Sequence, residues 1–195
     1  MSVAVKISPP EMTGVVHYED GSLEDIQEVL MEVINKDLGS QVEEFAKRMR
    51  RDAGSDYAFL RQLWNFCKYQ IRYKKDPAGL QLIKQPARLW AEREGDCKSL
   101  TVFIYHCCRV VGIPCIIRFA SYNRNKRIQH VYPVAVLKDR QVPVDAVWDY
   151  FDDEENATKI EDRMPKAWQD SINGIPAGVN WKDLIGLVAL AIIAR

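Results

Sequence analysis

Apolar positions in the first third of the chain repeat at the spacing of a helix face. Within residues 23–39, one side of a helix would collect Leu23, Ile26, Leu30, Val33 and Ile34. Ser22 stands before this segment as an N-cap, with Asp25 three residues further on, and Gly39 is a typical stop. The pattern predicts a helix between Ser22 and Gly39, followed by a second helix over residues 40–53.

A third helix is expected from Ser55 to residue 73. Its apolar stripe comprises Phe59, Leu63, Phe66, Cys67 and Ile71. Residues 74–86 hold two prolines and a glycine and are predicted to be turn-rich, and residues 87–94 are predicted to form a short helix.

The next apolar segment, residues 98–114, also repeats at helical period. Its spaced apolar positions are Leu100, Phe103, Ile104, Cys107, Cys108 and Val111. Residues 102–105 have strand propensity, so a strand is the competing interpretation. The length of the segment and its end at Gly112 and Pro114 favour a buried helix.

Beyond Pro114 the pattern changes to that of strands. Residues 115–122, 129–137 and 141–151 are rich in β-branched and aromatic side chains, and residues 138–140 are short enough for a hairpin turn. Residues 152–156 are predicted to form a solvated acidic loop, followed by irregular chain up to a terminal helix. Helices followed by antiparallel strands indicate an α+β fold.

Composition narrows the possible partners and compartment. The 195 residues contain 27 basic and 27 acidic side chains, so no net charge recruits nucleic acid or an anionic membrane. Five cysteines without paired spacing argue against a disulfide framework and favour a reducing, cytoplasmic setting. The apolar end, residues 181–195, is shorter than the roughly 20 residues that span a bilayer. We expect this helix to dock on the core or on another subunit, with a peripheral membrane or partner-binding tail as the alternative.

Cys97 differs from the other cysteines, which sit in apolar surroundings and are expected to be core residues. If Asp96 is the N-cap, Cys97 lies in the first turn of a helix, at an exposed loop boundary. The unpaired N–H groups and the dipole there favour a thiolate, whereas a free thiol has a pKa of about 8.5. The Asp96 carboxylate opposes this effect, so a nearby imidazolium is needed to complete the activation.

Geometry discriminates among the three histidines. His106 lies nine residues after Cys97 on the same helix, about 13 Å along the axis and out of phase with it. His17 falls in a segment that the pattern does not place. His130 begins a strand, and Asp145 interrupts the apolar run of the following strand. If those two strands pair, Asp145 can hold the imidazole of His130.

Four residues on and after the central helix are a candidate set of metal ligands: His106, Cys107, Cys108 and Cys115. Adjacent helix positions diverge by about 100°, and no C-x-x-C pair is present, so no metal is predicted. The acidic residues 149–156 lack a glycine at a loop-forming position, which argues against calcium. The basic residues 123–127 are interpreted as a solvated hairpin tip at the edge of a substrate cleft.

Three stretches together resemble the transglutaminase-like superfamily, a branch of the papain-type thiol enzymes. They are "GDCKSLTVFIYHCCRVVGIP", "QHVYPVAV" and "VPVDAVW". The upstream "LWNFCKYQIRY" followed by "DP" is similar to the family's helix before the active site. The approach to "GDC" resembles a phage and prophage subgroup. Members of that subgroup often read G-D-C-D-D, whereas this chain has Lys98 and Ser99 after the cysteine.

The resemblance implies a role for each matching residue. Cys97 is the expected nucleophile, His130 the general base and acid, and Asp145 the residue that orients His130. The Cys97 backbone N–H is expected to stabilise the oxyanion. The supporting residues are expected to be Gln85 or Trp90 as a side-chain donor, and Asp96.

The resemblance also implies an architecture and an activity. A helical extension (1–54), a papain-like catalytic core (55–152) and a C-terminal extension (153–195) are expected, with the nucleophile helix packed on an antiparallel sheet. The implied activity is hydrolysis of a protein or peptide amide bond through a thioester, without a cofactor. The alternatives are acyl transfer that cross-links proteins, or a non-catalytic phage module in the host cytoplasm or virion that contacts its partner through the terminal helix.

Overall fold

The computed structural model describes residues 15–19, 22–78 and 80–169. The elements are, in chain order, β1 (Val15–Glu19), α1 (Gln27–Asn35), the 3₁₀ turn η1 (Gly39–Gln41), α2 (Glu43–Ala53), α3 (Asp56–Gln70), β2 (Arg72–Tyr73), β3 (Leu80–Lys84), α4 (Pro86–Glu92), β4 (Glu94–Gly95), α5 (Cys97–Val110), β5 (Cys115–Ser121), β6 (His130–Val136), β7 (Gln141–Pro143), β8 (Lys159–Arg163) and α6 (Lys166–Gln169). The predicted succession of helices and then strands is present. The predicted terminal helix lies outside the described residues.

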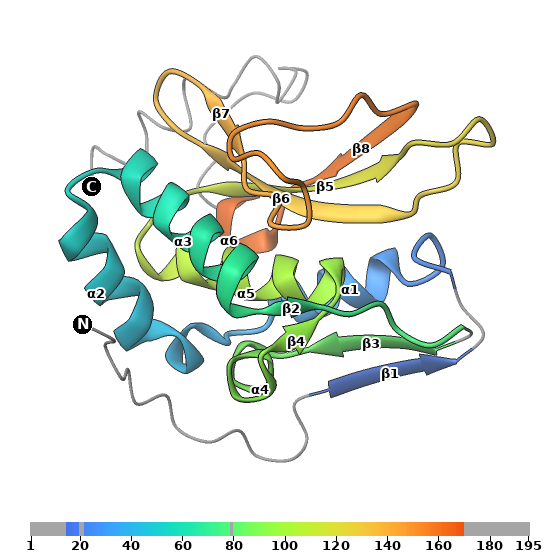
Figure 1. Ribbon diagram of the computed structural model, residues 1–195, viewed down its shortest axis with the longest axis horizontal. Coiled ribbons are helices and arrows are strands. Elements are labelled where there is room, and N and C mark those ends of the chain that lie inside the picture. Colours follow the sequence, from blue (N-terminus) through green and yellow to red (C-terminus); the bar gives the residue numbers. More distant parts are fainter. Residues whose placement is uncertain (1–14, 20–21, 79, 170–195) are drawn as a thin grey trace.

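Helix α5 is the centre of the fold. An antiparallel sheet of order β7-β6-β5-β8 lies on one side of it, and the small pairs β1–β3 and β2–β4 lie on the other (Figure 1). Helices α1, α2 and α3 also contact α5, so the first helices share its hydrophobic core. This arrangement is the α+β architecture expected from the sequence, with the helix that begins at Cys97 packed on the antiparallel sheet.

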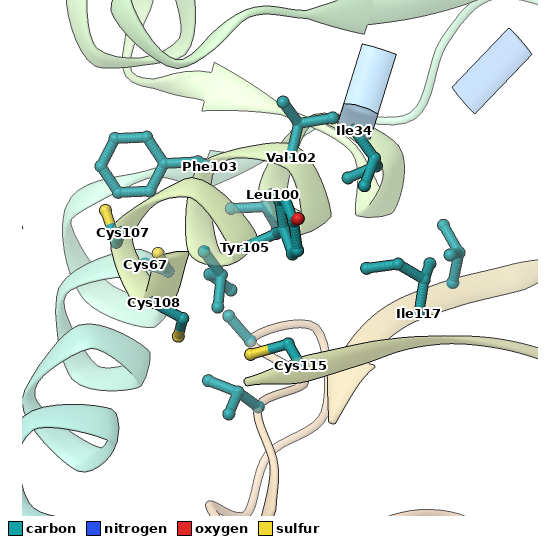
Figure 2. Close-up of a cluster of buried hydrophobic side chains, with 14 of the residues drawn as sticks. Ile34, Cys67, Leu100, Val102, Phe103, Tyr105, Cys107, Cys108, Cys115 and Ile117 are labelled. Atoms are coloured by element: carbon teal, nitrogen blue, oxygen red, sulfur yellow. The ribbon is translucent and has the colours of Figure 1, made fainter. Parts of the chain in front are cut away.

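Every residue of α5 from Cys97 to Cys108 is buried, which is why its sequence has no polar face. Figure 2 shows Cys67, Cys107, Cys108 and Cys115 among the aliphatic and aromatic side chains of this core. Burial raises the pKa of the Cys67 and Cys107 thiols well above the ordinary range. These four cysteines are therefore small core residues, as predicted, and the strand interpretation of residues 102–105 is wrong.

Helix boundaries follow local capping. The Ser55 hydroxyl accepts a hydrogen bond from the Ala58 N–H at 3.1 Å, so α3 begins where predicted. Ser22 and Asp25 exchange side-chain hydrogen bonds, but they close a turn before α1 rather than the helix itself. Helix α1 ends at Asn35, and Gly39 opens η1, so this helix is shorter than its apolar pattern suggested.

Of the eight strands in the described chain, five were not predicted (β1, β2, β3, β4 and β8), and one predicted strand is shorter than expected. Helix α3 ends at Gln70, so Arg72 and Tyr73, which were predicted to be helical, form β2 instead. Residues 80–84, expected to be a turn-rich segment, form β3 and pair with β1. Residues 159–163, expected to be irregular, form β8 at the sheet edge. The predicted strand through Asp145 ends at Pro143, although the hairpin turn before β7 is present. β8 is charged and partly exposed, so it lacks the apolar alternation that marks a strand.

A buried arginine on β5 binds both the edge strand β8 and the acidic loop before it. Arg118 on β5 bonds bidentately to Asp162 of β8 at 2.8 and 2.9 Å, and to Glu154 at 2.8 and 2.9 Å. The Tyr132 hydroxyl donates to the same Glu154 carboxylate at 2.7 Å. The loop over residues 152–156 is therefore not simply solvated, because Glu154 is part of a buried charge network.

Within the described chain no helix is long and apolar enough to span a bilayer.

We expect Arg118→Met to lower the free energy of unfolding by about 3–5 kcal/mol, because it leaves two carboxylates without their buried cation. Urea denaturation measures the change. Arg163→Met is the matched control: Arg163 bonds Glu28 at 2.9 Å on the surface, and its loss should cost less than about 1 kcal/mol. Equal costs for the two variants would contradict this account of the outer face.

A second prediction concerns His106, which is fully buried on α5 and has no part in the expected chemistry of Cys97. Among the described residues neither ring nitrogen meets the geometry of a hydrogen bond. Burial lowers the pKa of His106 from 6.5 to about 4, the charge of Arg109 adds to the effect, and the Val33 backbone opposes it. Between pH 6.5 and pH 4 the imidazole of His106 is therefore protonated in the unfolded chain but neutral in the folded chain. Stability should fall by about 3 kcal/mol as the pH drops from 6.5 to 4.

His106→Leu should flatten this part of the profile of unfolding free energy against pH. The slope is the measurement, because the substitution can also change stability at neutral pH. Parallel profiles for the wild type and His106→Leu would exclude His106 as the source of the acid sensitivity.

Candidate active site

The turn from β4 into α5 explains why glycine precedes the Asp-Cys pair. A Cβ atom at Gly95 would lie 2.5 Å from Leu89 Cδ1 and 3.0 Å from Ser99 Cβ, so no larger residue fits without displacement. Asp96 is the N-cap of α5, as predicted: its Oδ1 accepts hydrogen bonds from the N–H groups of Lys98 at 3.1 Å and Ser99 at 3.3 Å.

Cys97 is the first residue of α5, but it is not the exposed thiolate that the sequence suggested. Its exposed fraction is 7%, compared with 1% or less for the other four cysteines. Burial raises the pKa of the Cys97 thiol to about 12, against the lowering effect of the Val131 N–H, and the charges of Asp145 and Asp76 raise it further. Desolvation outweighs the helix dipole at this position, so the resting sulfur is a protonated thiol.

A buried ion cluster surrounds the start of α5. The Lys98 ammonium lies 3.0 Å from the Asp76 carboxylate and also contacts Asp96. Asp76 accepts a hydrogen bond from the Leu82 N–H at 2.7 Å. Lys98 therefore links the helix start to the segment between β2 and β3.

The contact expected between His130 and Asp145 is present. His130 Nε2 lies 2.6 Å from Asp145 Oδ2. Asp145 is positioned by two further bonds: its Oδ1 accepts the Val147 N–H at 3.0 Å, and its carbonyl accepts the Trp64 Nε1–H at 2.7 Å. The carboxylate lies just beyond β7, where a turn aims it at the imidazole, and not within the strand as predicted.

Cys97 and His130 are brought to the same end of the sheet by the packing of α5 on β6. A further link runs through the backbone. The Val131 carbonyl, one residue after His130, accepts a hydrogen bond from Thr101 of α5 at 3.0 Å, and the Val131 N–H lowers the pKa of the Cys97 thiol. Within the described chain, the hydrogen bonds join His130 to Asp145 but not His130 to Cys97. The structure thus places the histidine and aspartate in direct contact, and it bonds the residue after the histidine to α5.

The two residues proposed as side-chain oxyanion donors have other contacts. Gln85 Oε1 accepts a hydrogen bond from Gln41 at 3.0 Å. Trp90 stacks on Phe66, with ring centroids 5.1 Å apart, and its opposite neighbour is the Arg93 guanidinium at 3.8 Å. Both side chains therefore support the packing of α4, and no hydrogen bond among the described residues takes either to Cys97.

Tyr73 is a candidate site residue that the sequence patterns did not mark. It lies on β2 opposite Gly95 of β4, and its side chain is 40% exposed. Burial raises the pKa of its phenol to about 12, and the charges of Cys97 and Asp145 contribute, which puts the phenol within their electrostatic reach. The sequence signal was only an aromatic residue at the end of a predicted helix, and that is equally typical of packing.

The described residues contain no group of three or more histidine, cysteine or acidic side chains that can hold a metal ion.

A family model for the transglutaminase-like superfamily matches residues 43–168. The chain belongs to the transglutaminase-like superfamily. The match runs from α2 to α6, beyond both ends of the segment 55–152 in which the sequence motifs lie, so the family resemblance is wider than those motifs suggested. Membership of this superfamily supports a papain-like fold and a cysteine-type enzyme.

The remaining comparisons add less. A crystal structure of a protein from Cytophaga hutchinsonii named "Putative Cysteine Protease" is similar at 13% identity, with a TM-score of 0.44. The similarity covers 66% of this chain and 46% of that one, so this chain spans less than half of that protein. The comparison with curated proteins gave no match.

Proposed function

We propose that the protein is a cysteine-dependent hydrolase that cleaves a protein or peptide amide bond through a thioester acyl-enzyme. Cys97 is the nucleophile, His130 the general base and acid, and Asp145 the residue that orients the imidazole. The observation that carries the proposal is the 2.6 Å contact between His130 Nε2 and Asp145 Oδ2, with His130 on the strand that α5 packs against.

The high pKa of the thiol defines how the reaction begins. A lone thiolate at Cys97 is penalised by burial and by the neighbouring carboxylates. Transfer of the thiol proton to His130 creates a thiolate–imidazolium pair without net charge, and Asp145 stabilises the new cation. The base therefore has to act with the nucleophile, because the protein does not hold a free thiolate in advance.

The steps then follow from these positions. The sulfur attacks the amide carbon, and the imidazolium gives its proton to the leaving amine as the C–N bond breaks. Water next attacks the thioester, with His130 taking its proton. The C–S bond breaks, the acid is released, and the thiol recovers its proton from His130. An amine that replaced water in this second half would make the protein an acyl transferase.

The oxyanion is proposed to be held by the Cys97 backbone N–H, which as the first N–H of α5 has no intrahelical partner. Tyr73 is a better candidate for the side-chain donor than Gln85 or Trp90. A tyrosine phenol is protonated at neutral pH, and the pKa of this one is raised further, to about 12, so it can donate a hydrogen bond. Asp96 contributes indirectly by fixing the first turn of α5.

Alkylation by iodoacetamide, followed for each cysteine by peptide mass spectrometry, tests the role of the pair. We expect Cys97 to react faster than the core residues Cys67 and Cys107, and His130→Ala to slow it by about 10²–10⁴-fold near neutral pH. In His130→Ala the rate should climb tenfold per pH unit through pH 9, because the thiol alone has a pKa of about 12.

Cys97 labelling no faster than that of Cys67 would favour the non-catalytic module. With a reactive Cys97, the acyl group captured from a peptide library identifies the substrate by intact-protein mass spectrometry. Release of the captured acyl group as free acid, or its transfer to an added amine, separates hydrolysis from acyl transfer.

Tyr73→Phe tests the oxyanion donor separately. Acylation by a captured peptide should slow by about 10²–10³-fold, whereas alkylation of Cys97 should keep its rate because iodoacetamide forms no oxyanion. Tyr69→Phe is the matched control, since Tyr69 is 70% exposed at the end of α3. Equal acylation by both variants would remove Tyr73 from the proposed mechanism.

A further inference from the structure

We propose that Thr101 is a positioning residue for Cys97, and that its hydroxyl sets the spacing between the start of α5 and the strand that bears His130. This inference rests on the proposed function. The side chain is buried one helical turn after Cys97. Its Oγ1 lies 2.7 Å from the Cys97 carbonyl oxygen and 3.0 Å from the Val131 carbonyl oxygen.

The Val131 backbone needs these partners because of where β7 ends. Antiparallel strands direct the backbone groups of alternate residues to opposite neighbours. The Val136 N–H donates to the Pro114 carbonyl on the β5 side, whereas the Pro133 carbonyl accepts the Val144 N–H on the β7 side. Val131 has the parity of Pro133, so its N–H and carbonyl point to the β7 side, beyond the last residue that β7 pairs.

The first turn of α5 occupies this open edge. The Val131 carbonyl accepts the hydrogen bond of the Thr101 hydroxyl, and the Val131 N–H is close enough to the Cys97 thiol to lower its pKa. Both contacts fix the residue next to His130 against the nucleophile helix. Buried backbone groups in this position require hydrogen bonds, so the strand and helix cannot separate without leaving a carbonyl unpaired.

The hydroxyl has a consequence for reactivity. It has one proton for two carbonyl acceptors, one on α5 and one on β6, and so holds them at a fixed separation. Without it, a valine side chain of the same shape can fill the space but leaves the Val131 carbonyl without a donor. The strand start can then shift relative to the sulfur, and a displacement of about 1 Å between reacting groups can cost on the order of 100-fold in rate.

The experiment compares Thr101→Val, Thr101→Ser and Thr158→Val. Thr158 is the matched control, since its Oγ1 also bridges two carbonyls, those of Ser121 at 3.0 Å and Asn123 at 2.7 Å. We expect Thr101→Val to slow Cys97 alkylation by roughly 10–100-fold, and Thr101→Ser to restore it. Thr158→Val should lower the thermal unfolding temperature without changing the alkylation rate.

Hydrogen exchange of the Val131 amide, measured by NMR, tests whether the start of β6 moves away from α5 when its carbonyl loses the Thr101 hydroxyl. Its protection should fall in Thr101→Val and return in Thr101→Ser. The inference is overturned if Thr101→Val keeps both its protection and its alkylation rate, or if Thr158→Val slows alkylation as much.

A different pattern would separate this inference from the proposed function. If Val131 protection depends on the Thr101 hydroxyl but Cys97 reactivity is the same in the wild type and in His130→Ala, the helix–strand link stands and the proposed chemistry fails.

Discussion

The site depends on one constraint of sheet structure, which is that a buried strand edge must find hydrogen-bond partners. β7 pairs with β6 only from Val134 to Val136, so the start of β6 has no strand beside it on that side. The start of α5 lies there instead: the Thr101 hydroxyl donates to the Val131 carbonyl, and the Val131 N–H lowers the pKa of the Cys97 thiol. The same geometry places a helix N-terminus next to His130. The start of α5 therefore both satisfies the open edge of β6 and brings Cys97 to the strand that bears His130.

Burial then decides which form of the site is stable at rest. The helix start supplies N–H groups that favour a thiolate, but the sulfur is covered by protein, and the carboxylates of Asp76 and Asp145 act on it. In such surroundings a proton can leave the sulfur only if the charges left behind are paired. His130 can accept that proton, and its contact with Asp145 disperses the positive charge that results. A buried thiol can therefore still be reactive, because the thiolate forms only together with the imidazolium of His130.

Sequence patterns predicted this arrangement where the determinants are local. The period of the apolar residues marks α5, and the Asp96 carboxylate marks its start, because both depend on residues within a few positions. The contact of His130 with Asp145 followed from two strands joined by a short turn. The cover over Cys97 was not visible in the sequence, because the strands that enclose α5 come from both sides of it along the chain. β8 was missed for the same reason: it is held by Arg118, whose partner Asp162 lies 44 residues away.

Lys98 shows how the helix start remains stable with so many acids near it. The caps and turns of this region use Asp76 and Asp96, and both carboxylates are close to a thiol that must later become negative. A buried cation on the helix itself balances part of this charge, and burial lowers the pKa of the Lys98 ammonium while Asp76 opposes that shift. An acidic residue at the same place would add to the repulsion, so a chain that carried one would need another cation nearby. By binding Asp76, Lys98 also ties the segment that follows Tyr73 to the nucleophile helix. Lys98 therefore both offsets the negative charge near the sulfur and connects the nucleophile helix to the segment that carries Tyr73.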